Sequence, residues 1–126
     1  MNVLIDSRGW IEYFSGGPLA SKYAKFVESA NTLECVAPSI VLYEVYKKIK
    51  SEKDEETAIK AVAYIVGNAR IISIGKKIAL NAADISIISK LPMADAMIKA
   101  VAEDNNAKLV TGDKHFKDLE NVIFVE

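Results

Sequence analysis

The chain has 126 residues, of which 51% are hydrophobic and 26% are charged, and its formal net charge is -1. This balance supplies a core for one domain and excludes both a disordered chain and a protein held to nucleic acid mainly by bulk positive charge. A single cysteine, Cys35, excludes an internal disulfide, and no apolar run approaches the roughly 18 residues of a membrane-spanning helix. We therefore expect one cytoplasmic domain over residues 1–126.

The first predicted element is Val3-Leu4-Ile5, an unbroken run of branched apolar residues. Such a run is typical of a strand that is buried on both faces of a parallel sheet. Because it begins almost at the first residue, we expect this strand to be central. It ends at Asp6, and ligands of open α/β sheets bind beyond the carboxyl ends of the strands. Asp6 is therefore the first candidate functional residue.

Four further segments have the apolar composition of short strands, and helical patterns separate them. This alternation predicts crossover connections and a mostly parallel sheet that is covered on both faces, which is an α/β fold. The further predicted strands are residues 34–37, 70–74, 108–111 and 122–125.

The predicted helices follow apolar residues at helical spacing and end near Gly, Pro or charged residues. Ser7 can cap the first helix and Ser39 the third. The charged stretch 47–60 is interpreted as a solvated turn between two long helices. In the fifth helix, Ile78, Ala82, Ile85 and Ile88 are spaced for burial. The predicted helices contain residues 10–14, 21–31, 40–51, 57–68, 76–90 and 93–105, and a short turn or helix covers 114–119.

Two predicted strands end in a carboxylate beside a hydroxyl, in Asp6-Ser7 and in Thr111-Gly112-Asp113. If both strands point the same way, the two carboxylates lie at the same edge of the sheet. The alternative is that each aspartate only caps the helix that follows it.

Glu44 is the only charged residue in the stretch 39–46. Its helical neighbours Ile40 and Val41 are apolar, so its carboxylate loses hydration unless a positive group meets it. The alternative is an intrahelical ion pair with Lys48, four residues later.

Asp95 follows Pro92 at the start of a predicted helix. Its small neighbours Ala94 and Ala96 leave room for another group to approach. The alternative is a favourable interaction with the helix dipole, helped by Lys99 at the following turn.

Four carboxylates in these positions suit a hard cation, because Mg²⁺ and Mn²⁺ take oxygen ligands. A zinc site is not indicated, since Cys35 and His115 are the only soft ligands and lie far apart in the sequence. A nucleophilic triad is not indicated either, and the single histidine is interpreted as a surface residue.

The sequence resembles the PIN-domain ribonucleases, and within them the VapC-type toxins of toxin–antitoxin pairs. The resemblance covers nearly the whole chain. It is carried by Val3-Leu4-Ile5-Asp6-Ser7, by Glu44 after Pro38-Ser39, by Ala94-Asp95-Ala96, and most specifically by Leu109-Val110-Thr111-Gly112-Asp113-Lys114-His115-Phe116.

The resemblance implies a three-layer α/β/α PIN-like fold with a sheet of about five strands. It also implies an endoribonuclease that needs Mg²⁺ or Mn²⁺ and leaves 5′-phosphate and 3′-hydroxyl ends. Ser7 and Thr111 match hydroxyls that support the carboxylates by hydrogen bonds. The residues that match the family's catalytic and metal-binding quartet are Asp6, Glu44, Asp95 and Asp113.

Toxins of this family usually form homodimers and are inhibited by an antitoxin protein, so the resemblance implies both kinds of partner. Tyr43, Tyr46 and the stretch 47–60 are candidate surfaces for them.

Arg8 and Gly9 depart from the small hydroxyl or amide and aliphatic residues that the family commonly has after its first aspartate. Arg8 could contact an RNA phosphate, pair with one of the acids, or remain solvated. Lys114 is a second candidate for RNA contact, and Lys47, Lys48 and Lys117 could line the path of the RNA.

The alternative function is a degenerate, non-catalytic PIN domain that binds RNA or protein, with Arg8 in place of the metal. Retention of all four acids argues against it. Three other classes of α/β domain are not indicated. A receiver domain needs an aspartate at the end of its third strand, where Ser73-Ile74-Gly75 stands, and a haloacid-type phosphatase needs a second aspartate at position 8, which is arginine. A dinucleotide-binding domain needs the motif G-x-G-x-x-G after the first strand, and the sequence lacks it.

Overall fold

A five-stranded, entirely parallel sheet forms the centre of the structure, a computed structural model that describes all of residues 1–126. The strand order is β3-β2-β1-β4-β5, so β1 (Asn2–Ile5) is the central strand, as expected. The prediction of a mostly parallel sheet of about five strands is confirmed. The other strands are β2 (Cys35–Pro38), β3 (Arg70–Ile72), β4 (Ala107–Thr111) and β5 (Val122–Phe124).

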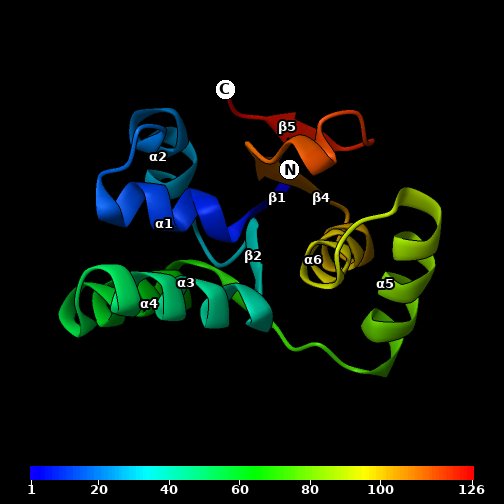
Figure 1. Cartoon of the computed structure of the whole chain (residues 1–126), viewed down its shortest axis with the longest axis horizontal. Helices are drawn as coiled ribbons and strands as arrows, with labels where there is room; N and C mark the ends of the chain where they lie inside the picture. The colour runs from blue at the N-terminus through cyan, green and yellow to red at the C-terminus, as the bar shows by residue number, and fades with distance from the viewer.

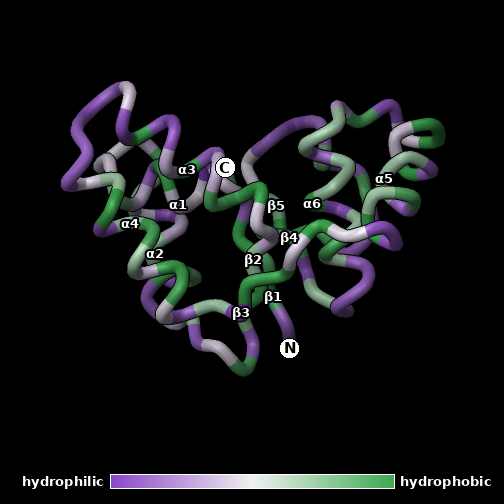
Figure 2. The backbone as a smooth tube through the Cα atoms, turned by 90° about the horizontal axis from the view of Figure 1, so that it is seen from below, coloured by the Kyte–Doolittle hydropathy of each residue, from purple (hydrophilic) through white to green (hydrophobic).

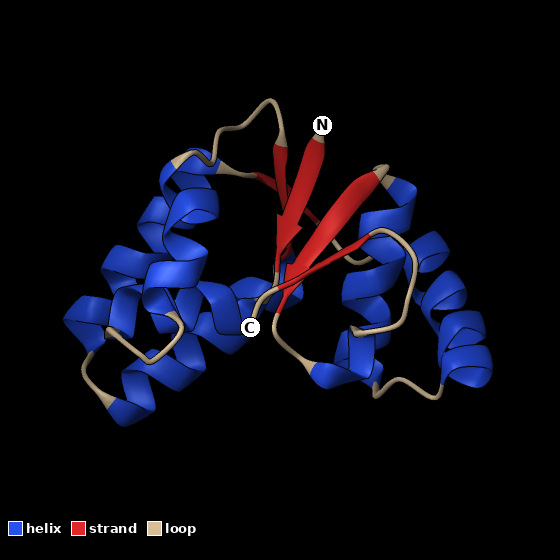
Figure 3. Cartoon of the chain, turned by 90° about the horizontal axis from the view of Figure 1, so that it is seen from above, coloured by secondary structure: helices blue, strands red, loops and turns tan.

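Helices cover both faces of the sheet, which gives the predicted three layers (Figures 1 and 3). The crossovers from β1 to β2 and from β2 to β3 run in the same direction, so their helices α1 to α4 lie on one face of the sheet. The connection from β3 to β4 runs in the opposite direction, so its helices α5 and α6 lie on the other face. No helix is both long enough and apolar enough to cross a membrane. The helices are α1 (Ser7–Ser15), α2 (Ala20–Glu28), α3 (Ser39–Glu52), α4 (Glu55–Asn68), α5 (Lys76–Ser89), α6 (Met93–Asp104) and the short 3₁₀ helix η1 (Lys114–Phe116).

The carboxyl-terminal halves of β1 and β4 are buried on both faces, which explains their apolar sequences. Leu4 and Ile5 of β1 and Leu109 and Val110 of β4 have no exposed surface. In Figure 2 the strands in the middle of the molecule are largely hydrophobic along their length. This rigid centre holds the carboxyl ends of β1 and β4 side by side.

The predicted cap of the first helix is wrong by one residue. Asp6 is the N-cap of α1, and its Oδ1 atom accepts a hydrogen bond of 2.8 Å from the Gly9 backbone N–H. Asp6 is extended, at φ -66° and ψ 164°, so its carboxylate reaches the open first turn of α1, whereas Ser7 already belongs to the helix. Ser39 likewise lies inside α3 and makes no cap hydrogen bond; Pro38 takes the N-cap position.

Two further expectations need correction. The stretch 47–60 is not mainly a turn: α3 extends to Glu52 and α4 begins at Glu55, so the charges lie mostly on exposed helix surface. Ile88 is 81% exposed rather than buried, because α5 packs through Ile78 and Ala82 against α6 and presents its other side outward.

Candidate functional site

Asp6 and Thr111 lie side by side at the carboxyl edge of the sheet. Ile5 pairs with Val110 in parallel register, so the next residue of each strand reaches the same level. The Thr111 hydroxyl donates a 2.5 Å hydrogen bond to Asp6 Oδ2 and accepts one of 3.0 Å from the Asp113 backbone N–H. Thr111 therefore links the two strand-end aspartates, which confirms that they share one edge.

The Asp6 carboxylate is buried, with 5% of the residue exposed. Burial raises its pKa to about 6, although hydrogen bonds from Thr111 and Gly9 lower it, and the negative charge of Asp113 raises it further. No Lys or Arg side chain forms an ion pair with any of the four candidate acids. The site thus collects negative charge without an internal lysine or arginine to balance it.

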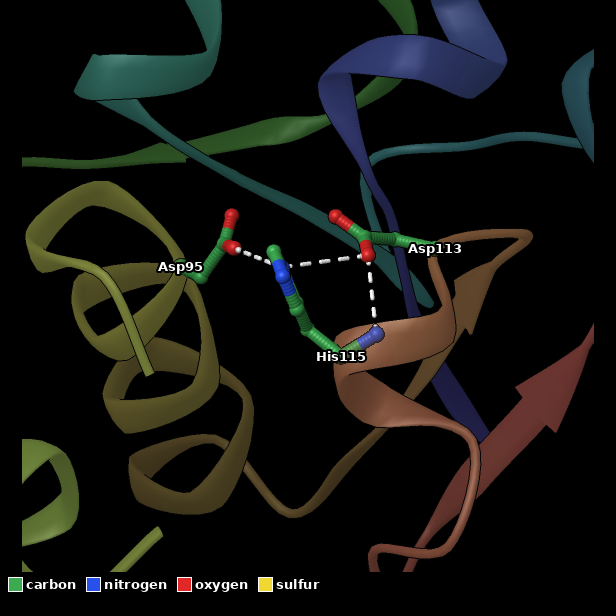
Figure 4. Close-up of side chains that lie close together, drawn as sticks. All are labelled: Asp95, Asp113 and His115. Carbon is green, nitrogen blue, oxygen red and sulfur yellow. Dashed lines mark hydrogen bonds and ion pairs between the residues drawn. The ribbon is translucent and has the colours of Figure 1, made fainter. Parts of the chain in front are cut away.

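Asp95, Asp113 and His115 form a compact cluster (Figure 4). His115 Nδ1 lies 3.2 Å from Asp95 Oδ2 and 3.3 Å from Asp113 Oδ1, and one ligand atom from each residue lies within 4.8 Å of the others. Burial raises the pKa of Asp95, the hydrogen bond from His115 lowers it, and the charge of Asp113 raises it. Two carboxylates and an imidazole are a suitable donor set for a divalent metal ion.

Glu44 joins the site through Ser7 rather than through the aspartates. Its Oε1 atom accepts a 2.6 Å hydrogen bond from the Ser7 hydroxyl. The alternative pair with Lys48 is not formed, because the Lys48 ammonium lies 2.5 Å from Glu52 Oε2. Glu44 is half-buried on α3 and faces the residue that follows Asp6.

The helix-cap interpretations of Asp6 and Asp113 are also confirmed. Asp113 Oδ1 accepts a hydrogen bond of 2.9 Å from the His115 backbone N–H and so caps η1. The two roles are compatible, since each carboxylate oxygen has two lone pairs and can accept a cap hydrogen bond while it also meets a second group. The pair of Asp95 with Lys99 is not formed, because the Lys99 ammonium donates to the Glu120 carbonyl at 2.9 Å.

A groove of about 840 Å³ runs between α1 and α3 and begins at Ser7 and Glu44. Arg8 lies in it and is exposed, with Nε 3.6 Å from Glu12 Oε1, so it does not pair with the four candidate acids. Lys114 lies on η1 outside this groove. The lining residues are Ser7, Arg8, Ile11, Glu12, Ser15, Tyr43, Glu44, Lys47, Lys48, Ser51 and Glu52.

Two residues at the site were not predicted. His115 has an exposed side chain, as expected, yet its ring nitrogen contacts both aspartates. The sequence feature that could have indicated this contact is the position of His115 two residues after Asp113, because a tight turn there brings the ring back to the carboxylate. Tyr23 of α2 is fully buried, and its hydroxyl accepts a 2.8 Å hydrogen bond from the backbone N–H of Gly112, the residue between Thr111 and Asp113. In the sequence, Tyr23 is one of the apolar residues at helical spacing in the predicted helix 21–31, and this spacing indicates burial but no contact with the site.

Comparison with known proteins identifies the family of the fold. The family model of the PIN domain matches residues 3–122. No curated protein sequence matches the chain.

Solved structures match over almost the full length of both chains. A toxin–antitoxin complex from Klebsiella pneumoniae is 24% identical, covers 97% of this chain and 96% of that chain, and has a TM-score of 0.79. VapBC2 from Rickettsia felis, bound to a promoter DNA fragment, is 19% identical, with 98% and 97% coverage and a TM-score of 0.73. The sarcin–ricin loop cleaving toxin VapC20 from Mycobacterium tuberculosis is 11% identical, with 92% coverage of each chain and a TM-score of 0.75. At these identities the likeness is one of fold, but the family model reaches from the first strand into the last, and the chain therefore belongs to the PIN-domain family.

Proposed function

We propose that this protein is a divalent-metal-dependent endoribonuclease and the toxin of a VapBC-type toxin–antitoxin pair, with residues 1–126 acting as one PIN domain. The observation that carries the proposal is the set of carboxylates Asp6, Asp95 and Asp113 at one sheet edge, with no lysine or arginine paired to them. Glu44 adjoins this set through Ser7. Such a set repels RNA unless cations neutralise it.

Asp95, Asp113 and His115 offer the most compact set of ligand atoms for Mg²⁺ or Mn²⁺, and Asp6 and Glu44 complete the negative site. A bound divalent ion supplies a water of lowered pKa and stabilises charge on a phosphoryl oxygen. The chain's own hydroxyls orient the acids: Thr111 holds the buried carboxylate of Asp6, and Ser7 holds that of Glu44. Loss of such supporting hydrogen bonds typically costs about 10- to 100-fold in metal affinity or activity.

We assign the groove between α1 and α3 to the RNA strand. It begins at Glu44 and carries the cationic side chains of Arg8, Lys47 and Lys48. Arg8 is best placed to meet a phosphate, because it follows Asp6-Ser7 directly and its guanidinium has five hydrogen-bond donors. Lys114 approaches from η1 beside Asp113 and is a second proposed RNA contact.

The proposed protein partners are an antitoxin and a second copy of the chain. The similar structures from Klebsiella pneumoniae and Rickettsia felis are a toxin–antitoxin complex and a VapBC protein, which supports the first partner. Tyr43, 60% exposed on α3, is a candidate contact for a partner protein.

RNA cleavage by the purified protein tests the function. We expect cleavage with Mg²⁺ or Mn²⁺, none with chelator, and loss of activity in Asp95→Asn, which keeps the side-chain shape and removes a charge. Asp84→Asn is the matched control, because Asp84 is an exposed aspartate on the neighbouring helix α5. Activity that survives equally in Asp95→Asn would identify a contaminant. An inactive protein that still binds RNA or a partner would favour the non-catalytic binding module.

A further inference from the structure

We propose that His115 Nδ1 is a ligand of the metal ion held by Asp95 and Asp113, and that this nitrogen makes the site prefer Mn²⁺ to Mg²⁺. The inference rests on the proposed function and deepens it, because it concerns the ion that the same site uses. It adds to the four carboxylates a residue of a different ligand class.

The separations within the cluster are those of ligands that share one ion. Metal–ligand bonds of roughly 2.1 Å place neighbouring ligand atoms roughly 3.0 Å apart in an octahedral site and roughly 3.4 Å apart in a tetrahedral one. His115 Nδ1 lies 3.2 Å from Asp95 Oδ2 and 3.3 Å from Asp113 Oδ1. Both distances fall inside this interval, and the ligand atoms of Asp95 and Asp113 lie within 4.8 Å of each other, so the three atoms surround a position that an ion can occupy after adjustment of the two carboxylates.

The turn after β4 holds the imidazole in this position. The His115 backbone N–H donates to Asp113 Oδ1, and the next residue, Phe116, is 1% exposed and packs in the core. The histidine backbone is thus fixed on both sides, and Figure 4 shows the ring directed between the two carboxylates. The outer part of the ring is exposed, with 59% of the side chain accessible, which leaves solvent a route to the site.

The ligand class decides which ion is favoured. Mg²⁺ is a hard cation that takes oxygen ligands and keeps several waters, whereas Mn²⁺, a first-row transition ion, takes oxygen ligands and is more tolerant of a nitrogen ligand. Mn²⁺ accepts carboxylate and imidazole together, so it gains more than Mg²⁺ from a site with one nitrogen. A cluster of carboxylates alone would favour Mn²⁺ over Mg²⁺ by less.

The same contacts would also arise if His115 were only a cationic bridge between two carboxylates. The two roles predict opposite changes in metal affinity. Removing a ligand weakens binding, while removing a cationic bridge strengthens it, because the bridge competes with the ion.

The test is metal binding by calorimetry on the metal-free protein. We expect His115→Phe, which keeps a ring and removes the nitrogen, to weaken Mn²⁺ binding about tenfold and Mg²⁺ binding much less. His115→Asn places an amide oxygen near the Nδ1 position, so we expect it to restore Mg²⁺ binding and to lower the Mn²⁺/Mg²⁺ preference. Asp118→Asn is the control, because it removes an exposed carboxylate on the same loop outside the cluster.

Electron spin-echo spectra of the Mn²⁺ complex give a second readout, since an imidazole nitrogen bound to the ion produces modulation that both His115 variants should lack. Unchanged or tighter Mn²⁺ binding in His115→Phe would overturn the ligand role. If Asp95→Asn also left metal binding unchanged, the proposed metal site itself would fail. If only Asp95→Asn lost binding, the site would stand and the role of His115 would not.

Discussion

Thr111 is the residue on which the alignment of the acidic site depends. Its buried hydroxyl donates to the carboxylate of Asp6 and accepts from the backbone N–H of Asp113. One side chain therefore fixes the positions of two candidate metal ligands relative to each other. A valine there would have the same shape but no hydroxyl. This explains in physical terms why a threonine, and not another β-branched residue, suits the end of β4.

The raised pKa of Asp6 predicts a pH dependence of folding in the metal-free protein. Its folded pKa of about 6 lies above the usual 3.8, so the folded state binds the proton more tightly than the unfolded state does. Stability from this group is complete below about pH 4 and is lost as the pH rises through about 6. The free energy of unfolding should fall by roughly 2 to 3 kcal/mol over this interval.

Urea denaturation at several pH values in the presence of chelator measures this loss. Asp6→Asn carries no proton to release, so its profile should show a smaller decrease between pH 4 and 6, and the part that remains comes from groups such as Asp95, whose pKa is also raised. A variant whose stability follows the same curve as the parent would show that another group is responsible.

Residue identities predicted much of the site, but not its contacts. The strand-end positions of Asp6 and Asp113 were sufficient to place both at one edge, because register and direction follow from a parallel sheet. The partner of Glu44 was not predictable, since Ser7 lies 37 residues away and meets it only after α1 and α3 pack. The contacts of His115 depend on a turn whose shape no periodic pattern encodes.

At the scale of elements, the pair α1 and α3 forms the groove assigned to RNA, and this assignment predicts a charge effect. Lys47→Glu should weaken RNA binding about tenfold at low salt and reduce the salt dependence of binding, because one cation near the phosphates is replaced by an anion. RNA binding is measured by fluorescence anisotropy in the Asp95→Asn background at one fixed Mg²⁺ concentration, where no cleavage is expected.

The matched control is Lys60→Glu, since Lys60 is an exposed helical lysine on α4 outside the groove. Equal weakening by both substitutions would indicate only a general effect of net charge, and the groove would then not be the path of the RNA.

Most elements could be predicted from periodicity, while their ends and outer faces could not. Helix α5 illustrates this: its extent agrees with the predicted 76–90 to within one residue, yet Ile88 points outward. An apolar stripe shows that a helix is amphipathic, but the width of the buried stripe depends on how many neighbours pack against it. The caps of α1 and α3 shifted for a similar reason, because extended strand ends supply the N-cap residue.

For the whole molecule, metal binding should stabilise the fold, because the ligands come together only when β1, α6 and the end of β4 are in place. An ion at 100 times its dissociation constant contributes about 2.7 kcal/mol. We expect Mn²⁺ to raise the melting temperature of the chelator-treated protein by several degrees, and Asp95→Asn to reduce this rise sharply. Calorimetric scans with and without Mn²⁺ measure this rise. An unchanged melting temperature would contradict a metal site that these ligands share.

The three-layer architecture as a whole was predictable, because alternating strands and helices with right-handed crossovers permit few arrangements. Which candidate acids come into direct contact was not. Asp95 and Asp113 meet through His115, while Glu44 lies against Ser7, and this division depends on the packing of α3 and α6 on opposite sides of the strand ends.

The place of β1 between β2 and β4 has a consequence for when the candidate site forms during folding. One neighbour of β1 follows it after about 30 residues and the other only after about 100, so the pairing that aligns Asp6 with Thr111 closes the longest loop in the sheet. Such non-local pairings form slowly during folding. In refolding experiments, the proposed nuclease activity should therefore appear with the final kinetic phase, and a chain whose helices have mostly formed should still lack it.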